Sequence, residues 1–532
     1  MTSFISELRK GPQMHLTDDH AITWQRPRVA IVGAGFGGLA VAKDLARTPV
    51  DVTLIDRENH HLFQPLLYQV ATAGLSPADI AWPIRGLVRQ QKNTRVQMGE
   101  VTGVDKVRKK VLLWDCEIGY DILVLATGAT YGYFGNDDWA VHAPGLKTID
   151  DATEIRRRLL LAFERAEVEP DAEKRRGLLS IVIVGGGPTG VEMAGAVVEL
   201  ARKTLAADFR AINPEETRVV LVEAGPRVLP GFPEPLSSYA ANALMGLGVD
   251  VQLERLVTKC DADGVVIGDE RVMAKTTIWA AGVTASPAAT WLGLEGDRAG
   301  RVPIGSGLKP TDTDDIYVIG DTAFAHYAAG EELPGIAPVA KQQGTYVANA
   351  IKAQVSGRAA PPPFHYRDRG QLATIGRKAA VITFGRFHLK GWFAWWIWGL
   401  AHIFFLISLR NRLIVMTQWL WSYISFEHGA RLITGMRTQP KREQIKINHV
   451  KGPPTTGQEA ASKKTPKVDR RTRVEVCSFK PKQPRFWFIS DCSLVDWLRK
   501  FERRTSQRRR MRSFIVGAAP YQEIESVASS PE

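Results

Sequence analysis

The chain has 532 residues, and at about 150 residues per domain this length predicts roughly three structural units. Its apolar fraction of 45% is ordinary for a packed globular protein. Only four cysteines occur, without a CxxC pair or metal-ligand spacing, which argues against both a disulfide framework and a metal centre.

The net charge of +13 is concentrated at one end of the chain. Residues 437–532 contain 22 Lys or Arg and 10 Asp or Glu, so this stretch carries nearly all of the excess. Its composition predicts a largely disordered basic tail that can bind anionic lipid, and nucleic acid is the less favoured partner. At the other end, residues 1–26 are expected to form a loose arm without the apolar core of a secretory signal.

Between these ends, β-branched apolar runs alternate with glycine turns and amphipathic stretches, which is typical of an α/β fold with parallel sheets. Charged or amphipathic helices are expected at 155–167 and at about 338–354. The Pro-rich stretch at 360–366 marks a boundary, and short strands are expected after it. The runs that predict strands are RVAIV at 28–32, DVTLID at 51–56, DILVLATG at 121–128, TRVVLVEAG at 217–225, TTIWAAG at 276–282, DIYVIGDTA at 315–323 and LATIGRKAAVITFG at 372–385.

Two glycine loops repeat one motif. The first is Gly33-x-Gly35-x-x-Gly38 and the second is Gly185-x-Gly187-x-x-Gly190, and each follows an apolar run and precedes an expected helix. Glycine here permits a tight turn and close approach of the backbone to a pyrophosphate at the helix N-terminus. The sequence therefore predicts two dinucleotide sites.

An acidic residue ends the strand after each loop. Asp56 ends DVTLID and Glu223 ends VVLVE, the place where a carboxylate accepts a hydrogen bond from a ribose hydroxyl. Because a carboxylate repels a 2′-phosphate, Glu223 predicts a preference for NADH over NADPH, although Arg227 lies nearby.

With these motifs, the chain resembles the flavoproteins that have two dinucleotide-binding domains. The resemblance implies two Rossmann-like domains, with the NAD domain inserted in the FAD domain, and hydride transfer from nicotinamide to flavin. It implies FAD and NAD(H) as cofactors. The cofactor-binding residues that it implies are Gly33, Gly35, Phe36, Gly37, Gly38, Asp56, Thr127, Gly128, Asp321, Gly185, Gly187, Pro188, Thr189, Gly190, Glu223 and Gly282.

Within that group, the chain is similar to the type II NADH dehydrogenases, the single-chain NADH:quinone oxidoreductases of respiratory membranes. The similarity rests on ENHHLFQPLLYQVATAGLSP at 58–77, which has no cysteine, and on GGGPTGVEMAG, ERAE, IAPVAKQQG and LATIGRKAAV. It implies a quinone as electron acceptor and attachment to the membrane surface by C-terminal helices. No proton-pumping channel is evident in the sequence, so no proton pumping is expected, and the lack of an obvious transit peptide favours the cytoplasmic face of a bacterial inner membrane. The similarity leaves a homodimer open. Cys116 and Cys260 are interpreted as structural residues in strands.

Four residues are implied to be catalytic by the same similarity. Glu192 would lie near the nicotinamide–flavin contact, Gln342 and Gln343 would face the quinone, and Lys378 would stabilise the reduced quinone. The chain departs from a common family pattern because Pro338 replaces the first Gln of AQxxxQQ.

The implied division is a 1–26 arm, a FAD domain in two parts at 27–150 and 296–360, and a NADH domain at 151–295. Strands and membrane-associating helices follow at 361–436, and the basic tail at 437–532.

The run from Gly391 to Leu409 contains four tryptophans and is long enough to span a membrane. A second apolar run follows at 413–426. We expect these two runs to form an interfacial helix pair, because tryptophan favours the headgroup boundary and a single span would separate the basic tail from the body. A transmembrane span remains the alternative. Two other functions also stay open: a reductase with a soluble ferredoxin- or rubredoxin-type acceptor, and a non-catalytic flavoprotein that senses NADH.

Overall fold

The computed structural model describes residues 14–16, 22–24, 26–326, 332–425 and 429–435. The chain divides into two compact units, Met1–Pro440 and Lys441–Glu532, and every described residue belongs to the first. The predictions for the basic tail lie outside the described residues. Within the predicted loose arm, β1 (Met14–Leu16) and β2 (Ile22–Trp24) pair as a short antiparallel hairpin, so this arm is not entirely irregular.

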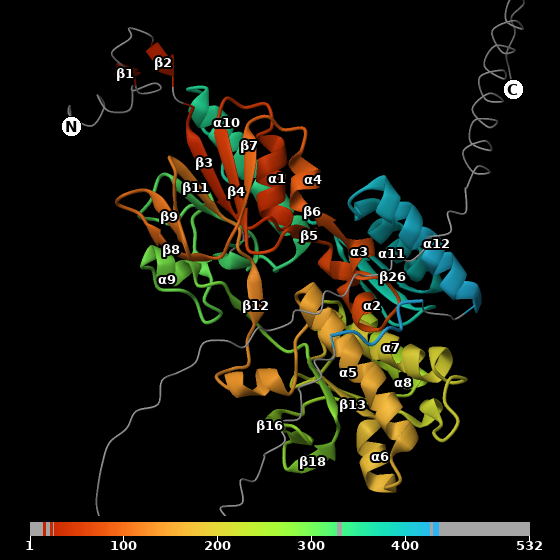
Figure 1. The fold of residues 1–532 in the computed structure, drawn as a ribbon. Coiled ribbons are helices and arrows are strands. Elements are labelled where there is room, and N and C mark those ends of the chain that lie inside the picture. The colour runs from red at the N-terminus through yellow and green to blue at the C-terminus, as the bar shows by residue number, and fades with distance from the viewer. Residues whose placement is uncertain (1–13, 17–21, 25, 327–331, 426–428, 436–532) are drawn as a thin grey trace, which may run out of the picture. The chain divides into compact units, whose positions relative to one another are not determined.

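The first sheet is parallel and has five strands in the order β22-β11-β3-β4-β7 (Figure 1). Its central strands form because their side chains are apolar on both faces, which suits a sheet covered by helices on both sides. Helices α1 (Phe36–Asp44) and α10 (Ala337–Val355) pack against one another beside it. The strands are β3 (Arg28–Val32), β4 (Asp51–Asp56), β7 (Thr94–Met98), β11 (Ile122–Leu125) and β22 (Ile316–Val318).

The second sheet is also parallel, in the order β15-β14-β13-β19. Its helices are α5 (Ile149–Val168), α7 (Pro188–Glu199) and α8 (Glu234–Leu247). The helix expected at 155–167 begins earlier, because Thr148 caps α5 by accepting a hydrogen bond from the Asp151 N–H at 3.1 Å. The strands are β13 (Ser180–Val184), β14 (Arg218–Val222), β15 (Val249–Gln252) and β19 (Thr276–Trp279).

The order of the strands confirms the predicted fold class. Strand β22 follows the whole second sheet in sequence but pairs with β11 in the first sheet, so the second dinucleotide-type sheet is inserted into the first. The two crossing segments, β12 (Ala129–Tyr131) and β20 (Val283–Ala285), pair antiparallel between the sheets. This is the arrangement that the resemblance to flavoproteins with two dinucleotide-binding domains implies.

Smaller sheets flank these two. One contains β8 (Val101–Asp105), β9 (Lys110–Leu113) and β10 (Glu117–Gly119), and another contains β16 (Val257–Asp261), β17 (Gly264–Ile267) and β18 (Glu270–Met273). Cys260 is buried in β16 as expected, but Cys116 is exposed in the turn before β10, not in a strand. The other element named below is α2 (Leu67–Ala71).

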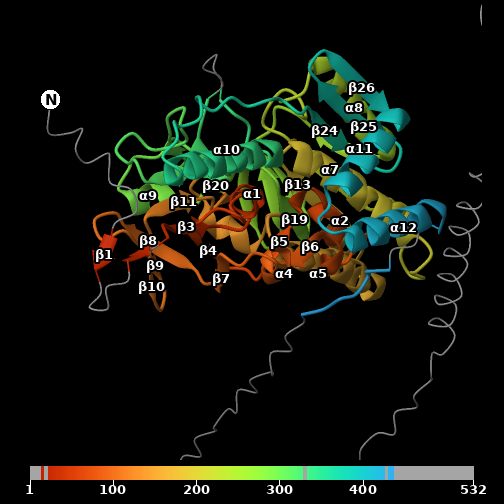
Figure 2. The same ribbon diagram turned by 90° about the horizontal axis from the view of Figure 1, so that it is seen from above.

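After the Pro-rich boundary, three antiparallel strands precede two helices (Figure 2). They are β24 (Gln371–Thr374), β25 (Ala380–Phe384), β26 (Phe387–Gly391), α11 (Trp392–Phe405) and α12 (Leu409–Ser425). The long apolar run is not one helix, because α11 ends at Phe405 and Ser408 has a φ of 78°. In the part of the chain that the structure describes, no helix combines the length and apolarity that crossing a bilayer requires.

Candidate active site

The first glycine loop joins β3 to α1 and is closely packed on its protein side. Gly33 has a φ of +98°, and a Cβ there would lie 2.2 Å from the Ala126 carbonyl oxygen. A Cβ on Gly38 would lie 1.9 Å from the Gly33 carbonyl oxygen, whereas one on Gly35 would meet nothing within 4 Å. The open side at Gly35 lies at the α1 N-terminus, so this loop fits the diphosphate of a dinucleotide.

The second loop repeats this geometry between β13 and α7. Gly185 has a φ of +109°, and a Cβ on Gly190 would lie 1.8 Å from the Gly185 carbonyl oxygen. Gly187 faces open space as Gly35 does, and the exposed Pro188 and Thr189 begin α7. The same local backbone, built twice, indicates two sites for the same kind of ligand.

The two strand-end carboxylates are held in matching ways. Asp56 accepts from the Ala34 N–H at 2.6 Å, and Glu223 accepts from the Gly186 N–H at 2.5 Å. In each case the donor is the residue directly after the first glycine of the loop. Each carboxylate therefore lies against its loop at the end of its strand, where a ribose would be bound. Burial raises the pKa of Asp56, and the N–H groups of Ala34 and Glu58 partly offset this.

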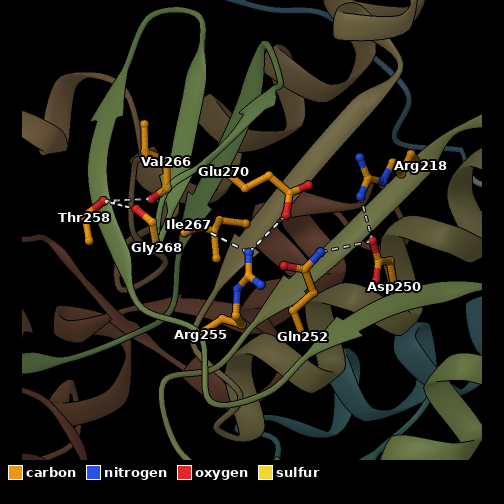
Figure 3. Close-up of polar contacts among 9 residues, drawn as sticks. All are labelled: Arg218, Asp250, Gln252, Arg255, Thr258, Val266, Ile267, Gly268 and Glu270. Atoms are coloured by element: carbon orange, nitrogen blue, oxygen red, sulfur yellow. Dashed lines mark hydrogen bonds and ion pairs between the residues drawn. The ribbon is translucent and has the colours of Figure 1, made fainter.

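Two sets of polar contacts lie near the strand that carries Glu223: one joins β14 to β15, and the other joins Arg255, after β15, to the β17–β18 hairpin (Figure 3). The Arg255 N–H donates to the Glu223 carbonyl at 3.1 Å. The Arg255 guanidinium donates to the Ile267 carbonyl at 3.2 Å and to Glu270 at 3.0 Å. Arg218 pairs with Asp250 on the neighbouring strands at 2.8 Å. The Arg255 contacts hold the backbone at the Glu223 end of β14, whereas the Arg218–Asp250 pair lies at the other end of this strand.

Residues from three separated segments meet at the carboxyl end of the first sheet. The Thr127 hydroxyl lies 2.5 Å from that of Ser286 and 3.0 Å from that of Thr322. The Thr322 hydroxyl donates to the Gly128 carbonyl at 3.1 Å. Gly282, with a φ of +135°, lies just before β20 on the returning segment. This cluster joins the ATG turn, the inserted segment and the turn that carries Asp321.

Asp321 lies in a tight turn held by α10. The buried Gln343 accepts from the Gly320 N–H at 2.7 Å, so its amide supports this turn directly. Helices α10 and α1 cross closely, since a Cβ on Gly344 would lie 2.4 Å from the Gly37 carbonyl oxygen. Phe36, the first residue of α1, packs edge-on against His61 and Phe63. The helix after the first loop and the Asp321 turn are thus fixed relative to one another.

A cavity of about 90 Å³ lies among α2, α7, the β24–β25 turn, α11 and α12. Two carboxyl groups of α7, Glu192 and Glu199, line it from one side, and tryptophans of α11 and α12 line it from another. The lining residues are Tyr68, Gln69, Thr72, Gly74, Glu192, Ala196, Glu199, Thr374, Gly376, Arg377, Trp395, Trp398, Trp419, Ser422 and Tyr423. The cavity therefore combines buried titratable groups with an aromatic wall.

The two carboxyl groups have different partners. Glu199 accepts from the Arg377 N–H at 2.6 Å, and its other oxygen lies 3.8 Å from the guanidinium of the same residue. Glu192 accepts only a long bond of 3.5 Å from the Thr374 N–H among the described contacts. Burial raises the pKa of Glu192 to about 8, so this carboxyl holds a proton at neutral pH.

A hydrogen-bonded chain runs from α12 into the cavity. The Trp419 indole N–H donates to Gln69 at 2.7 Å, and the Gln69 amide donates to the Tyr68 hydroxyl at 2.9 Å. Burial first, and the charge of Glu192 next, raise the pKa of Tyr68 well above its ordinary value. The Arg377 guanidinium also donates to the Ser422 carbonyl of α12 at 2.5 Å. The last helix is thus bonded to residues of the cavity.

The other residues implied to be catalytic do not line this cavity. Gln342 forms a reciprocal pair with the Arg367 backbone, at 2.9 and 3.0 Å, and Lys378 is exposed in the β24–β25 turn next to Arg377. The sequence reasoning singled out Glu192 but none of its neighbours. Spacing offered one signal, because Glu199 follows Glu192 by two helical turns and so faces the same side.

Two family models match the chain. That of the pyridine nucleotide-disulphide oxidoreductases covers residues 27–344, and that of the NDH2 C-terminal domain covers residues 369–425. A type II NADH:quinone oxidoreductase of Mycobacterium tuberculosis, NdhA, is 44% identical over 426 residues, which cover 77% of this chain and 90% of the relative. One from Staphylococcus haemolyticus is 33% identical, covering 68% of this chain and 90% of the relative.

Solved structures agree on the fold. NDH2 from Plasmodium falciparum, in complex with NADH, matches with a TM-score of 0.70 at 20% identity and covers 77% of this chain and 100% of that one. With the two repeated loops, the inserted sheet and these relatives together, the chain belongs to the pyridine nucleotide-disulphide oxidoreductase family and, within it, to the type II NADH:quinone oxidoreductases.

Proposed function

We propose that this chain oxidises NADH and reduces a membrane quinone, with FAD as its resident cofactor and without proton pumping. The observation that carries the proposal is the pair of matching loops, each with an open central glycine and a carboxylate on the neighbouring strand end. When bound, FAD supplies the chemistry that accepts a hydride and delivers two electrons. The balanced reaction is NADH + H⁺ + quinone giving NAD⁺ + quinol.

The chain's own residues bind and orient the two nucleotides. Gly33, Gly35 and Gly38 would hold the FAD diphosphate, with Asp56 toward the ribose and Asp321 and Thr127 toward the ribityl side. The second set, Gly185, Gly187, Gly190 and Glu223, would hold NADH in the same way. Glu223 would accept from a ribose 2′-hydroxyl and repel a 2′-phosphate, which favours NADH over NADPH.

The cavity beside α7 would form the proton-donating wall of the quinone site, because its volume of about 90 Å³ is too small to enclose the quinone head. A quinone that gains two electrons also needs protons, and the protonated Glu192 is a buried donor there. Arg377 keeps Glu199 in an ion pair, so the two carboxyl groups can play different roles. The Trp419–Gln69–Tyr68 chain would fix the polar wall that orients the head.

The helices α11 and α12 would attach the enzyme to the bilayer, on the cytoplasmic side of a bacterial membrane where NADH is available. Ala394, Trp398 and His402 of α11 are buried, spaced four residues apart on one face. Both helices also expose large apolar residues, as an interfacial helix requires. These are Trp392, Phe393, Trp396, Leu400, Phe404 and Phe405 on α11, and Leu409, Leu413, Met416, Leu420 and Trp421 on α12.

One assay tests the proposed reaction. Purified, FAD-loaded protein is supplied with NADH and either a short-chain quinone or a one-electron protein acceptor such as a ferredoxin. We expect rapid turnover with the quinone and little with the protein. Fast turnover with the protein alone would establish a soluble-acceptor reductase instead. Flavin bleaching by NADH without turnover on either acceptor would indicate a sensor.

A further inference from the structure

The hairpin formed by β25 and β26 has an apolar face that ends in exposed aromatic side chains. Phe384 pairs directly with Phe387, and Ile382 pairs with Leu389. Directly opposed residues on neighbouring strands lie on one side of a sheet, and so do residues two apart, so all four share a face. Along this face Ile382 is buried, Leu389 is 37% exposed, Phe384 53% and Phe387 73%. Exposure therefore increases toward the tip.

The base of the hairpin is held against the body of the protein. Helices α8 and α11 both pack against β25 and β26. The Lys390 ammonium lies 5.4 Å from the centre of the Tyr239 ring of α8. Strand β26 is at the edge of its sheet. The tip is thus presented by a fixed base and is not an isolated loop.

The hairpin leads directly into the helix that we propose to lie on the membrane. Gly391, with a φ of +85°, ends β26 and immediately precedes α11. The first residues of α11, Trp392 and Phe393, are 55% and 62% exposed. Apolar exposure therefore continues along the chain from the hairpin tip into α11.

The charged side chains of the hairpin favour a lipid surface over another protein chain as the partner of this face. Arg386 stands at the tip between the two phenylalanines, and His388 and Lys390 alternate with Phe387 and Leu389 along β26. An arginine between two exposed phenylalanines, with a lysine at the base of the same hairpin, suits the headgroup region of an anionic bilayer. A free edge strand with such side chains would otherwise favour association with other chains.

We propose that the tip of the β25–β26 hairpin, residues 384–389, is a second membrane-binding element that inserts Phe384 and Phe387 among anionic lipids beside α11. The proposal rests on the membrane attachment proposed above. It extends that attachment from the two helices to a β-hairpin, and it makes the membrane contact of the enzyme broader than a helix pair.

The test measures binding of the full-length, FAD-loaded enzyme to vesicles of phosphatidylcholine and phosphatidylglycerol by co-sedimentation. The double variant Phe384→Ser, Phe387→Ser should need roughly tenfold more lipid for half-binding, because two partly inserted rings are lost. A matched control is Trp114→Ser, at a residue 88% exposed between β9 and β10, which should bind as the unaltered enzyme does. NADH oxidation with a water-soluble quinone should be unchanged in all three.

A second readout places the tip directly. Arg386→Cys, in a background in which Cys116, Cys477 and Cys492 are each replaced by serine, is labelled with an environment-sensitive dye and should show a blue-shifted emission when vesicles are added. Equal lipid dependence of the double variant and the unaltered enzyme, or an unshifted dye, overturns the proposal. The proposal is also overturned if the double variant changes from dimer to monomer but still binds vesicles, because this face would then be a contact between two copies of the chain. Failure of the unaltered enzyme to bind vesicles would instead refute the attachment by α11 and α12.

Discussion

Glu192 and Glu199 lie two turns apart on α7 and line the same buried cavity, but the structure gives an arginine partner only to Glu199. Burial disfavours the charged form of both groups and raises the pKa of each, but Arg377 partly offsets this at Glu199, whereas the pKa of Glu192 rises to about 8. The first two predictions follow from this difference.

The first prediction concerns stability. The pKa of Glu192 rises from 4.5 to about 8 on folding, so the folded state binds the extra proton between these values. The stabilisation of the folded state by this proton is complete below pH about 4.5, and it is lost as the pH rises toward 8. In Glu192→Gln this loss is absent. The melting temperature of the variant, relative to the unaltered protein, should therefore increase from pH 5 to pH 8 in thermal unfolding, and a constant difference would contradict the assigned protonation.

The second prediction concerns turnover. If Glu192 supplies a proton to the reduced quinone, Glu192→Gln should lower quinone-dependent kcat by roughly 10²-fold. The rate of the unaltered enzyme should fall as the pH passes about 8, while the variant should lack this step. Steady-state rates with a short-chain quinone between pH 6 and pH 9 provide the measurement. An unchanged pH profile in the variant would assign the proton to another group.

The third prediction concerns Glu223. Its two carboxylate oxygens accept from the N–H groups of Gly186 and Gly225, at 2.5 and 2.7 Å. Glu223→Gln should raise the KM for NADH by about tenfold and reduce the preference over NADPH, because the ribose loses a charged acceptor. Stopped-flow flavin reduction with both donors measures this. Glu234→Gln, at an exposed carboxyl of α8, is the control that should change neither.

The fourth prediction concerns the crossing of α1 and α10. Gly344→Ala would place a methyl group 2.4 Å from the Gly37 carbonyl oxygen, so the helices must separate. We expect a loss of about 1–3 kcal/mol in unfolding free energy and a lower flavin-to-protein ratio. Gly246→Ala is the matched control, because a Cβ there meets nothing within 4 Å and α8 should gain up to about 1 kcal/mol. Equal stability of the two variants would be incompatible with the close crossing.

The fifth prediction concerns Trp419. In Trp419→Phe the ring can still stack on Trp398, at 5.4 Å between centroids, but the donor to Gln69 is lost. We expect quinone-dependent turnover to fall several-fold while reduction of the flavin by NADH is unaffected. Trp421→Phe changes an exposed ring of the same helix and should have neither effect. A similar loss in both variants would point to membrane contact in place of the cavity.

Local patterns predicted the strands, both loops and their carboxylates well. The strands RVAIV and DVTLID and the two glycine loops depend on residues that lie close together in the chain. The local sequence therefore predicts them without information about distant contacts. The cavity was not predictable in this way. Gln69 and Trp419 are 350 residues apart, and their contact depends on how α2 and α12 pack.

Two single positions also show what the sequence pattern does not predict. Pro338, which stands where the family pattern has a glutamine, lies in the first turn of α10, where a proline is tolerated because the first N–H groups of a helix have no partner within it. The sequence also favoured Lys378, whereas Arg377 reaches the cavity and α12. Neighbouring residues of a turn can point in different directions, and composition does not reveal which one points inward.

The return of β22 to the first sheet has a consequence for biosynthesis. Strand β11 ends at Leu125, but its outer neighbour begins only at Ile316, after the entire second sheet. On the ribosome, the second sheet can therefore close while the first still presents an unprotected edge. Full flavin loading should therefore wait until β22 has been synthesised, and expression at lower temperature or with chaperones should increase the yield of yellow protein.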